Sequence, residues 1–390
     1  MSAVLETLGL RRASVLLPAK NVSPEKFAVI ACDQFSSDLE YWQKVERAAG
    51  DSPSALNLII PEARLGERSE ADAARAITSA MGEYLDKGYL EDIGETFVYV
   101  KRQTSAGVRR GLVAAFDLEA YEFTSGAKSL IRATEGTVAE RLPARKSVRS
   151  IAPLELPHAL VLVDEPQNEL FELLEARSRE MKKLYDFELM LGGGHIEGLR
   201  ADSDALVSEI AYILERDRAR REGFLFAMGD GNHSFAAAKQ WWDELKESLT
   251  EQERKTHPAR FALAELVNIH DKGLVVEPIH RLLIGVDPQK AARELGVDPL
   301  SPPPLPALQP MLDDYLARHE GASLDYIHGA DDCLRLAASA ADRLAIIYGG
   351  FERASIFRDV EASGALPRKS FSLGVARDKR YYLEGRRITP

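Results

Sequence analysis

The order of apolar and polar positions along the chain predicts short buried strands separated by amphipathic helices. Short apolar runs bounded by turn-forming residues are typical of strands, and they occupy 15–18, 27–31, 56–60, 97–100, 111–116, 159–163 and 261–269. Helix-forming composition with capping residues at the ends marks 38–48, 69–87, 168–184 and 202–220. We therefore expect an α/β to α+β fold, in which helices pack on a mixed sheet core.

Proline divides the chain into two unequal parts. Residues 1–297 are predicted to form the mixed α/β core, and residues 311–390 a smaller C-terminal α+β part that can pack back on it. Between them we expect a stiff, extended connector at residues 298–310. Its prolines are Pro299, Pro302, Pro303, Pro304 and Pro306.

The most informative local pattern is a strand, a glycine turn and a helix start between residues 224 and 246. The run 224–228 is apolar, Gly229 and Gly231 permit a tight turn, and an alanine-rich helix follows. Such a corner directs unpaired backbone N–H groups and the positive end of a helix dipole at one point. This arrangement favours an anion, most often a phosphate.

The same turn carries side chains that are capable of chemistry. Asp230 supplies a carboxylate and His233 an imidazole, while Asn232 and Ser234 are residue types that cap helices. The alternative is a plain corner between strand and helix, in which Asp230, Asn232 and Ser234 only cap the helix. The pattern is neither a Walker loop nor a dinucleotide-binding motif.

Four other places combine turns with reactive or charged residues. Asp33 follows an apolar run, and His195 follows three consecutive glycines. His280 and Arg281 follow another run, where they suit an anion or simply face solvent. The segment 128–149 has six basic and two acidic residues, a surplus of four positive charges. Arginine there is suited to bidentate phosphate contacts, or the segment is a solvated basic loop or an intrachain ion-pair network.

Composition narrows the classes of partner. The formal net charge of −11 argues against nucleic-acid or anionic-membrane binding, each of which needs a basic face. The two cysteines, Cys32 and Cys333, are far apart and in no metal-binding spacing. Because there is no long apolar run and no signal-peptide pattern at the N-terminus, we expect a cytoplasmic protein.

Six blocks of the sequence, in their order along the chain, resemble the bacterial and archaeal DUF1015 family, a family of unknown function. The resemblance covers nearly the whole chain and implies no activity by itself. The blocks are 31–35, 129–137, 192–195, 229–234, 277–281 and 366–370.

A shorter resemblance concerns residues 230–234 alone. This turn is similar to the phosphate-binding turn of free-serine kinases related to the partition protein ParB and to sulfiredoxin. Many relatives have His and Arg where this chain has Asn232 and Ser234. The resemblance implies a nucleotide (ADP or ATP) with Mg²⁺, and a link to serine or phosphoserine.

Together these observations lead us to expect a phosphoryl-transfer enzyme, a kinase or a phosphatase, acting on a small anionic or polar metabolite. His233 or His195 would serve as general base or transient phosphate acceptor. Asp230 would orient a histidine or hold the metal ion. The residues expected to bind phosphate or substrate are Gly231, Asn232, Ser234, Arg132, Glu135, Thr137, His280, Arg281, Arg368, Lys369 and Ser370.

Two other functions fit the same residues. One is a non-catalytic sensor that binds an anionic metabolite or nucleotide. The other is a metal-dependent hydrolase that uses His195, Asp230, His233 and His280. All three functions require the candidate residues to share a site. We therefore expect Asp230, His233, His195, Arg132 and His280 to line one cleft.

Overall fold

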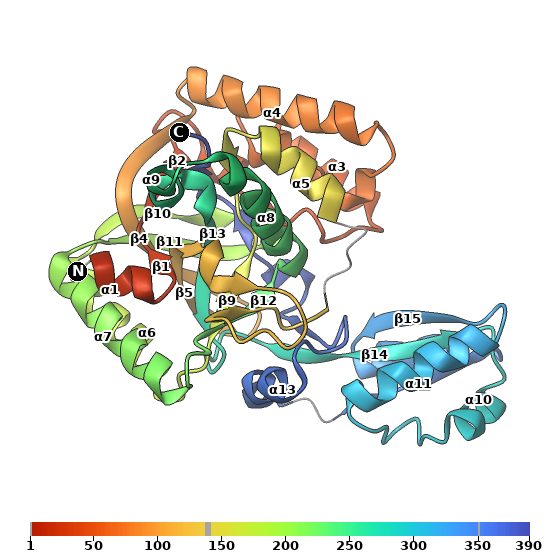
Figure 1. Cartoon of the computed structure of the whole chain (residues 1–390). Coiled ribbons are helices and arrows are strands. Elements are labelled where there is room, and N and C mark those ends of the chain that lie inside the picture. Colours follow the sequence, from red (N-terminus) through yellow and green to blue (C-terminus); the bar gives the residue numbers. More distant parts are fainter. Residues whose placement is uncertain (1, 137–141, 350–351) are drawn as a thin grey trace.

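The chain folds into a large core and a smaller lobe that projects from it (Figure 1). The computed structural model describes residues 2–136, 142–349 and 352–390. We call residues 276–349 the lobe and the remaining described residues the core. Mixed sheets covered by helices confirm the expected α/β to α+β class.

The core is built on one mixed sheet of eleven strands. Its main order is β10-β11-β4-β5-β13-β9-β12-β7-β6, with β1 paired to β5 and β2 to β4. The strands are β1 (Leu10–Arg11), β2 (Ala13–Pro18), β4 (Leu90–Thr104), β5 (Gly107–Asp117), β6 (Tyr121–Glu122), β7 (Ile131–Arg132), β9 (Leu160–Val163), β10 (Lys182–Leu189), β11 (Gly194–Ala201), β12 (Phe226–Asp230) and β13 (Phe261–Asn268).

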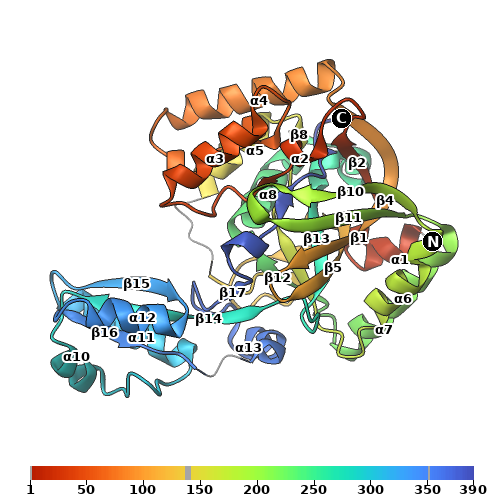
Figure 2. The ribbon, with the colours of Figure 1, turned by 180° about the vertical axis from the view of Figure 1, so that it is seen from behind.

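Helices cover both faces of this sheet, which explains why its central strands are apolar almost throughout. Phe97, Tyr99 and Phe116 point to one face, whereas Val98 and Val113 point to the other. The first face packs on α1 (Ser2–Thr7), α6 (Glu169–Arg177), α7 (Asp204–Arg220) and α8 (Asn232–Leu245). The second packs on α2 (Pro24–Phe27), α3 (Leu39–Ala49) and α4 (Glu70–Asp86), which Figure 2 shows from behind.

Three further helices complete the core. Helix α5 (Leu142–Ile151) lies between α4 and α8 (Figure 1). Helix α9 (Glu251–Thr256) follows α8, and α13 (Ile356–Ser363) packs Ile356, Phe357 and Val360 against Phe224 and Ala227. Short 3₁₀ turns join several of these elements.

The lobe has its own sheet and its own apolar core. Strand β14 (Val276–Ile284) lies between β15 (Ser323–His328) and β16 (Arg343–Ile346), and its first residues pair with β17 (Phe371–Leu373). Helices α10 (Pro288–Leu295) and α11 (Leu305–Arg318) bury Leu295, Leu308 and Leu312 with this sheet. Helix α12 (Ala330–Ala338) buries Cys333 in a second cluster.

After the lobe, the chain returns to the core. Strand β18 (Tyr381–Tyr382) pairs with β3 (Val29–Ile30), and β19 (Arg386–Arg387) pairs with β8 (Leu154–Glu155). The last twenty residues therefore belong to the core, and they bring late-sequence side chains next to early ones.

The boundary predicted after residue 297 needs correction. Strand β14 and helix α10 precede it and already belong to the lobe, because their apolar residues pack with α11. The connector expected at 298–310 is also partly helical, since α11 begins at Leu305. Pro306 fits the first turn of a helix, where the N–H group that proline lacks has no partner in any case.

Two secondary-structure predictions were also wrong. Residues Ala55–Leu58 form a 3₁₀ helix capped by Ser54, not a strand, because a short apolar run suits either structure. The helix expected at 168–184 ends at Arg177, and the chain then enters β10. There the alternating burial of Tyr185, Phe187 and Leu189 has the strand period of two.

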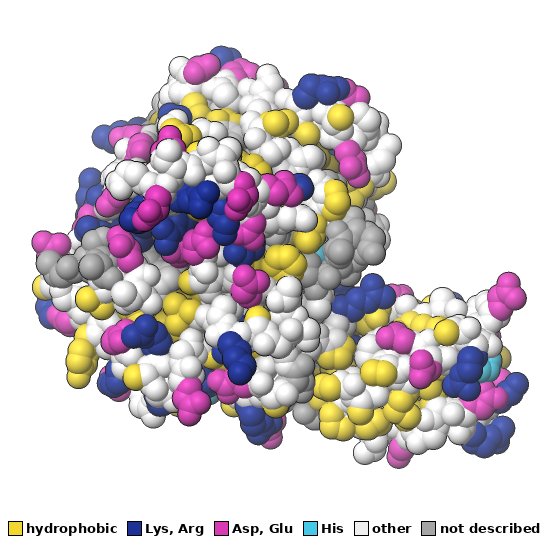
Figure 3. All heavy atoms as spheres, viewed as in Figure 1, with side chains coloured by type: hydrophobic (Ala, Val, Ile, Leu, Met, Phe, Trp, Pro, Cys, Tyr) yellow, Lys and Arg dark blue, Asp and Glu magenta, His cyan; other side chains and the backbone are white. Residues whose placement is uncertain are grey.

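The visible surface has no single sign of charge. On the face in Figure 3, basic and acidic side chains are interspersed over the core, and apolar side chains gather on part of the lobe. Among the described helices, none has both the length and the apolar content needed to cross a membrane.

Candidate functional site

The candidate site begins at the corner between β12 and α8. Asp230 ends β12, and its Oδ1 accepts a hydrogen bond of 2.9 Å from the N–H group of Gly231. Gly231 has a φ of 76°, in the left-handed region. A Cβ atom there would lie 2.9 Å from Ala159 Cβ and 3.0 Å from Ala159 Cα. Glycine is therefore required by the fold itself at this position.

The residues expected to cap α8 lie inside its first turn instead. Gly231 is the N-cap and has no side chain with which to cap, so Asn232, His233 and Ser234 are the first three helical residues. Within the described residues, Asn232 Oδ1 is buried without a hydrogen-bond partner. The alternative interpretation of this turn, in which Asp230, Asn232 and Ser234 only cap the helix, required a side-chain cap. Helix α8 begins without one.

Asp230 is paired with a lysine that the sequence analysis did not select. Lys379 Nζ lies 3.0 Å from Asp230 Oδ2, and both side chains are largely shielded from solvent. Burial raises the pKa of Asp230, but Lys379, His158 and the Gly231 N–H group outweigh it, so that its pKa lies below the ordinary value of 3.8. Asp230 is therefore a carboxylate at neutral pH.

A second cluster joins His158, Tyr382 and Cys32. The Tyr382 hydroxyl lies 3.2 Å from His158 Nδ1 and 3.1 Å from Cys32 Sγ, and it accepts a 3.2 Å hydrogen bond from the Cys32 N–H group. Burial, followed by the charge of Asp33, raises the pKa of Cys32 to about 12. Burial also raises the pKa of Tyr382 well above 10. Both groups therefore keep their protons at neutral pH.

A cavity of about 1590 Å³ connects this cluster with the start of α8. Cys32, Asp33, His158, Ser234 and Tyr382 all line it. Further along, apolar side chains of α4, α5 and neighbouring turns form its walls, and Arg145 lines it while paired with Glu62 at 3.1 Å. The fold thus brings two of the sequence blocks, 31–35 and 229–234, to one cavity.

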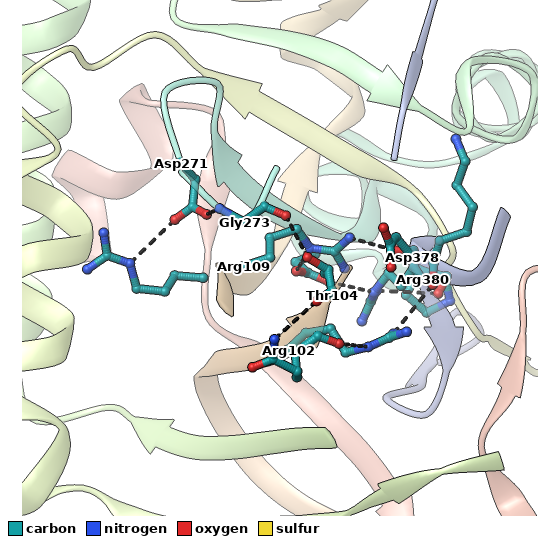
Figure 4. Close-up of polar contacts among 12 residues, drawn as sticks. Arg102, Thr104, Arg109, Asp271, Gly273, Asp378 and Arg380 are labelled. Atoms are coloured by element: carbon teal, nitrogen blue, oxygen red, sulfur yellow. Dashed lines mark hydrogen bonds and ion pairs between the residues drawn. The ribbon is translucent and has the colours of Figure 1, made fainter. Parts of the chain in front are cut away.

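Buried arginines fix the C-terminal segment that carries Lys379 and Tyr382 (Figure 4). Arg102 of β4 donates hydrogen bonds to the carbonyls of Arg377 at 3.0 Å and Lys379 at 3.4 Å, and also to that of Gly193. Arg109 of β5 donates a 2.8 Å hydrogen bond to the Asp378 carbonyl. A guanidinium group suits this role, because its five N–H donors can satisfy several carbonyls at once.

A buried acid balances these arginines. Glu265 of β13 lies 3.5 Å from Arg109 and 3.1 Å from Arg380, and all three side chains are almost inaccessible to solvent. Its carboxylate occupies the space above Gly111, where a Cβ atom would clash with it. The charges are thus paired inside the core, which is the condition for burying them.

Other predicted site residues meet at the junction between core and lobe. The Glu135 carboxylate accepts hydrogen bonds from the N–H groups of Lys369 at 3.1 Å and Ser370 at 3.0 Å. Burial raises the pKa of Glu135, although these N–H groups oppose the effect. Lys369 has a φ of 58°, a left-handed conformation that aims its N–H group at the acid. Here Glu135 holds the junction together through the backbone.

His280 and Arg281 serve the lobe. Arg281 is fully buried and donates hydrogen bonds to the Ile279 carbonyl, to Gln309 at 3.4 Å and to the Arg368 carbonyl at 3.5 Å. His280 is buried, and its Nδ1 accepts from the Tyr348 N–H group at 3.2 Å. Burial, and then Arg281, lowers the pKa of His280. Neither side chain is exposed to an incoming anion in this structure.

Arg132 and His195 lie away from the α8 corner. Arg132 donates a 2.9 Å hydrogen bond to the Ser129 carbonyl, and its guanidinium group lies 4.2 Å from the centre of the Phe224 ring. His195 lies on β11, where its two ring nitrogens contact Asp186 at 2.7 Å and Glu188 at 2.9 Å. The hydrogen bond that His195 makes to Glu188 raises its pKa most, burial lowers it, and the hydrogen bond to Asp186 raises it further, so that the net shift is upward.

The prediction that one cleft contains all the candidates is therefore wrong: His195, Arg132 and His280 lie apart, and none of the five predicted residues lines the cavity, which residues 229–234 reach only at Ser234. In the sheet, β11 and β12 are separated by four other strands, and Arg132 faces the Phe224 side of β7. Arg368 and Lys369 are exposed at the junction, where the Arg368 guanidinium lies 5.6 Å from the Tyr326 ring centre. Thr137 lies outside the described residues.

The described part of the chain contains no group of three or more His, Cys, Asp or Glu side chains placed to hold a metal ion. The hydrolase interpretation combined His233 with three residues that have separate partners in the structure. His195 contacts Asp186 and Glu188, Asp230 pairs with Lys379, and His280 accepts from the Tyr348 N–H group. This set therefore does not form the metal site that the hydrolase interpretation required.

The fold and site define a mixed α/β protein with a cavity at the start of a helix, lined by both apolar and charged side chains. Residues 16–297 match the family described as "Protein of unknown function (DUF1015)", and the chain belongs to this family. The match covers five of the six sequence blocks on which the resemblance rested. No curated protein matches the chain.

Two solved structures have low similarity to the chain. One is SbnI with C-terminal truncation from Staphylococcus aureus, at 10% identity and a TM-score of 0.34, covering 67% of this chain and 82% of that one. The other is a conserved hypothetical protein from Pyrococcus furiosus, at 12% identity and a TM-score of 0.29, covering 58% of this chain and 92% of that one. These scores are too low to transfer a function.

Proposed function

We propose that this protein is a phosphoryl-transfer enzyme acting on a small polar metabolite such as serine or phosphoserine. One observation carries the proposal: the first turn of α8 opens, at Ser234, into the same cavity as His158 and Asp33. A helix start favours a phosphate, and an imidazole can exchange a proton with the attacking or leaving oxygen.

The charges around the corner support a phosphate at this position. The N-terminal end of α8 carries the positive end of the helix dipole, and its N-cap has no side-chain acceptor. Lys379 pairs with Asp230 and so limits the repulsion that this carboxylate would exert on an anion. The buried Asn232 Oδ1, without a partner among the described residues, is an acceptor for a ligand hydroxyl or ammonium group.

A nucleotide fits the site as the phosphoryl donor. The cavity volume of about 1590 Å³ exceeds what serine or phosphoserine would fill, and the apolar part of its lining, which lies among charged side chains, suits a base and a sugar. Asp33 lines the same cavity and has the oxygen ligands that Mg²⁺ prefers together with phosphate groups. A bound Mg²⁺ would neutralise charge on the phosphates.

The proposal is tested by ³¹P NMR on the purified protein. Serine with ATP or ADP and Mg²⁺ tests for a kinase, and phosphoserine alone tests for a phosphatase. His195→Asn is the matched control, because His195 is bound by Asp186 and Glu188 on another part of the sheet. We expect turnover in one of the two reactions, with an unchanged rate in the control.

Three other results have distinct meanings. Binding of phosphoserine or nucleotide without turnover would mean that the protein is a sensor and not an enzyme. The identities of Asn232 and Ser234 are consistent with that outcome, because kinase-like relatives have His and Arg at these two positions. Loss of turnover in His195→Asn would move the chemistry to β11. Neither binding nor turnover with any member of the panel would reject the proposed function.

A further inference from the structure

We propose that His158 is the residue that exchanges the proton in this reaction, and that Tyr382 and Cys32 position it. The chemistry of this inference rests on the proposed function. The positioning of His158 is inferred independently, from three contacts of the Tyr382 hydroxyl group. The sequence analysis chose His233 and His195 for the role. The structure instead offers a histidine whose ring is held by a buried tyrosine and which lines the cavity.

The Tyr382 hydroxyl has a single proton to share among its contacts. This oxygen contacts Cys32 Sγ at 3.1 Å and His158 Nδ1 at 3.2 Å, and it accepts from the Cys32 N–H group at 3.2 Å. Because Tyr382 is 3% exposed, its hydrogen bonds are made inside the protein. With one proton to give, the hydroxyl can donate to Cys32 Sγ or to His158 Nδ1, but not to both.

The structure has this hydroxyl donating to Cys32 Sγ, and this direction leaves the oxygen free to accept from both His158 Nδ1–H and Cys32 N–H. Every contact of the hydroxyl is then satisfied, and the neutral imidazole carries its proton on Nδ1. Its Nε2 lone pair is left to accept a proton, since the hydrogen bond at one ring nitrogen sets the state of the other. A protonated His158 keeps the same Nδ1–H donor, so taking up a proton requires no rearrangement around Tyr382.

His158 lies in the cavity lining, close to the corner between β12 and α8. His158 and Ala159 precede β9, whose Leu160 is the register partner of Asp230 in β12. Ala159 is the residue on which Gly231 packs. Tyr382 contacts His158, and the charges of His158 and Asp230 act on each other. Lys379 acts on Asp230, and Asp33 acts on Cys32 and Tyr382. The negative charge of Asp230 stabilises the imidazolium that forms.

In the proton-exchange step, His158 Nε2 takes the proton of the acceptor hydroxyl, which belongs to the metabolite or to water. The O–H bond breaks, and an Nε2–H bond forms. The electron pair of that oxygen forms a new bond to phosphorus, and the bond from phosphorus to the leaving oxygen of the phosphoanhydride or phosphoester breaks. The leaving oxygen keeps that electron pair and takes the proton from His158 Nε2. Asp33 would hold a Mg²⁺ ion, which would supply charge neutralisation at the phosphates.

The first test needs no substrate. In protein labelled with ¹⁵N-histidine, neutral His158 should carry its proton on Nδ1. Cys32→Ala removes the acceptor of the Tyr382 proton, so the hydroxyl should turn to Nδ1 and shift the neutral tautomer toward Nε2–H. Cys32→Ser supplies a new acceptor and should restore the wild-type tautomer. Tyr382→Phe should also disturb the tautomer, but it leaves the buried Cys32 N–H group unpaired.

The second test is kinetic and uses whichever substrate pair the wild type turns over. His158→Asn should lower kcat by about a hundredfold or more, the scale of general acid–base assistance. Cys32→Ala should lower kcat about tenfold and move the acid limb of its pH profile, with little change in KM. Cys32→Ser should restore most of the wild-type kcat and most of the wild-type pH profile. His195→Asn should leave rate and pH profile unchanged.

The outcomes separate this inference from the proposed function. The positioning role of Tyr382 and Cys32 would be overturned, without any activity assay, if neutral His158 carried its proton on Nε2 in the wild type. It would also be overturned if Cys32→Ala left the tautomer of His158 unchanged. Turnover that survives His158→Asn but not His233→Asn would overturn the catalytic role and leave the proposed function standing. If nothing in the panel turns over, the proposed function and the role of His158 in it fail together. In that case the NMR tautomer measurement tests only whether Tyr382 and Cys32 set the proton position on His158.

Discussion

The ion pair of Asp230 with Lys379 sets the charge of the proposed site. Lys379→Met should destabilise the protein by about 1–3 kcal/mol at pH 7, because it leaves a shielded carboxylate without its partner. The pKa of Asp230 lies below 3.8, so its stabilising contribution is present above 3.8 and lost as pH falls through the folded-state pKa. Urea unfolding at pH 7 and at pH 3 measures the difference.

The loss in Lys379→Met should therefore shrink in acid, where Asp230 becomes protonated. Asp230→Asn provides the control, since adding Lys379→Met to it should cost less than in the wild type. An equal cost in both backgrounds would mean that the two side chains are not coupled.

Asp217 shows a different residue-scale effect, away from the site. It is 1% exposed, and Arg220 lies 3.2 Å from its Oδ1, although neither carboxylate oxygen accepts a hydrogen bond in the described part of the chain. Burial raises its pKa to about 6, with Arg220 opposing the shift. Because the pKa of Asp217 is higher in the folded state than the 3.8 of the unfolded state, its protonated form adds to the free energy of unfolding below pH 3.8. This contribution is lost as pH rises through about 6.

Asp217→Asn should accordingly stabilise the protein at pH 7.5 by about 1–3 kcal/mol, because the buried negative charge is removed. Chemical denaturation at pH 7.5 and pH 4 gives the comparison, and the gain should be small at pH 4. A destabilised Asp217→Asn at pH 7.5 would show that the ion pair with Arg220 outweighs the cost of burying the carboxylate.

At the scale of elements, Gly231 determines how α8 begins. Gly231→Ala should lower stability by about 1–2 kcal/mol for the left-handed conformation alone, and more for the contact with Ala159. Gly296→Ala, at a helix end with a similar φ of 66° and nothing within 4 Å, separates the two causes. Thermal unfolding should show the larger loss for Gly231→Ala. Equal losses would mean that Ala159 moves aside.

The elements that sequence could predict are those defined by local pattern. The β4–β5 hairpin, β13 and the strand–turn–helix at Asp230 all follow from apolar runs and glycine turns. The site partners could not be predicted in this way, because Lys379 is 149 residues from Asp230 and Tyr382 is 224 residues from His158. The charged block before Tyr381 was the available signal, since charges beside a buried strand need partners.

Family resemblance predicted the blocks but not their roles. Glu135, Arg281 and Ser370 were expected to bind a ligand, yet in the structure Glu135 and Arg281 bind backbone groups at the core–lobe junction. A buried arginine and an anion-binding arginine have the same sequence pattern, and only the partners distinguish them. Their roles toward a ligand remain predictions.

At the scale of the whole molecule, a ligand in the cavity should stabilise the folded state. Phosphoserine or a nucleotide at a hundred times its Kd should add about 2.7 kcal/mol and raise the thermal midpoint. Serine without a phosphate should raise it less. If phosphoserine, serine and nucleotides at millimolar concentration all leave the midpoint unchanged, the cavity is not an anion site.

The most direct test of the account is a crystal structure with phosphoserine or a nucleotide bound. We predict that a phosphate group lies in the cavity at the first turn of α8, within hydrogen-bond distance of a backbone N–H group there, with the Nε2 side of His158 facing the reacting oxygen. A phosphate bound at the core–lobe junction, or anywhere away from α8 and His158, would contradict the account.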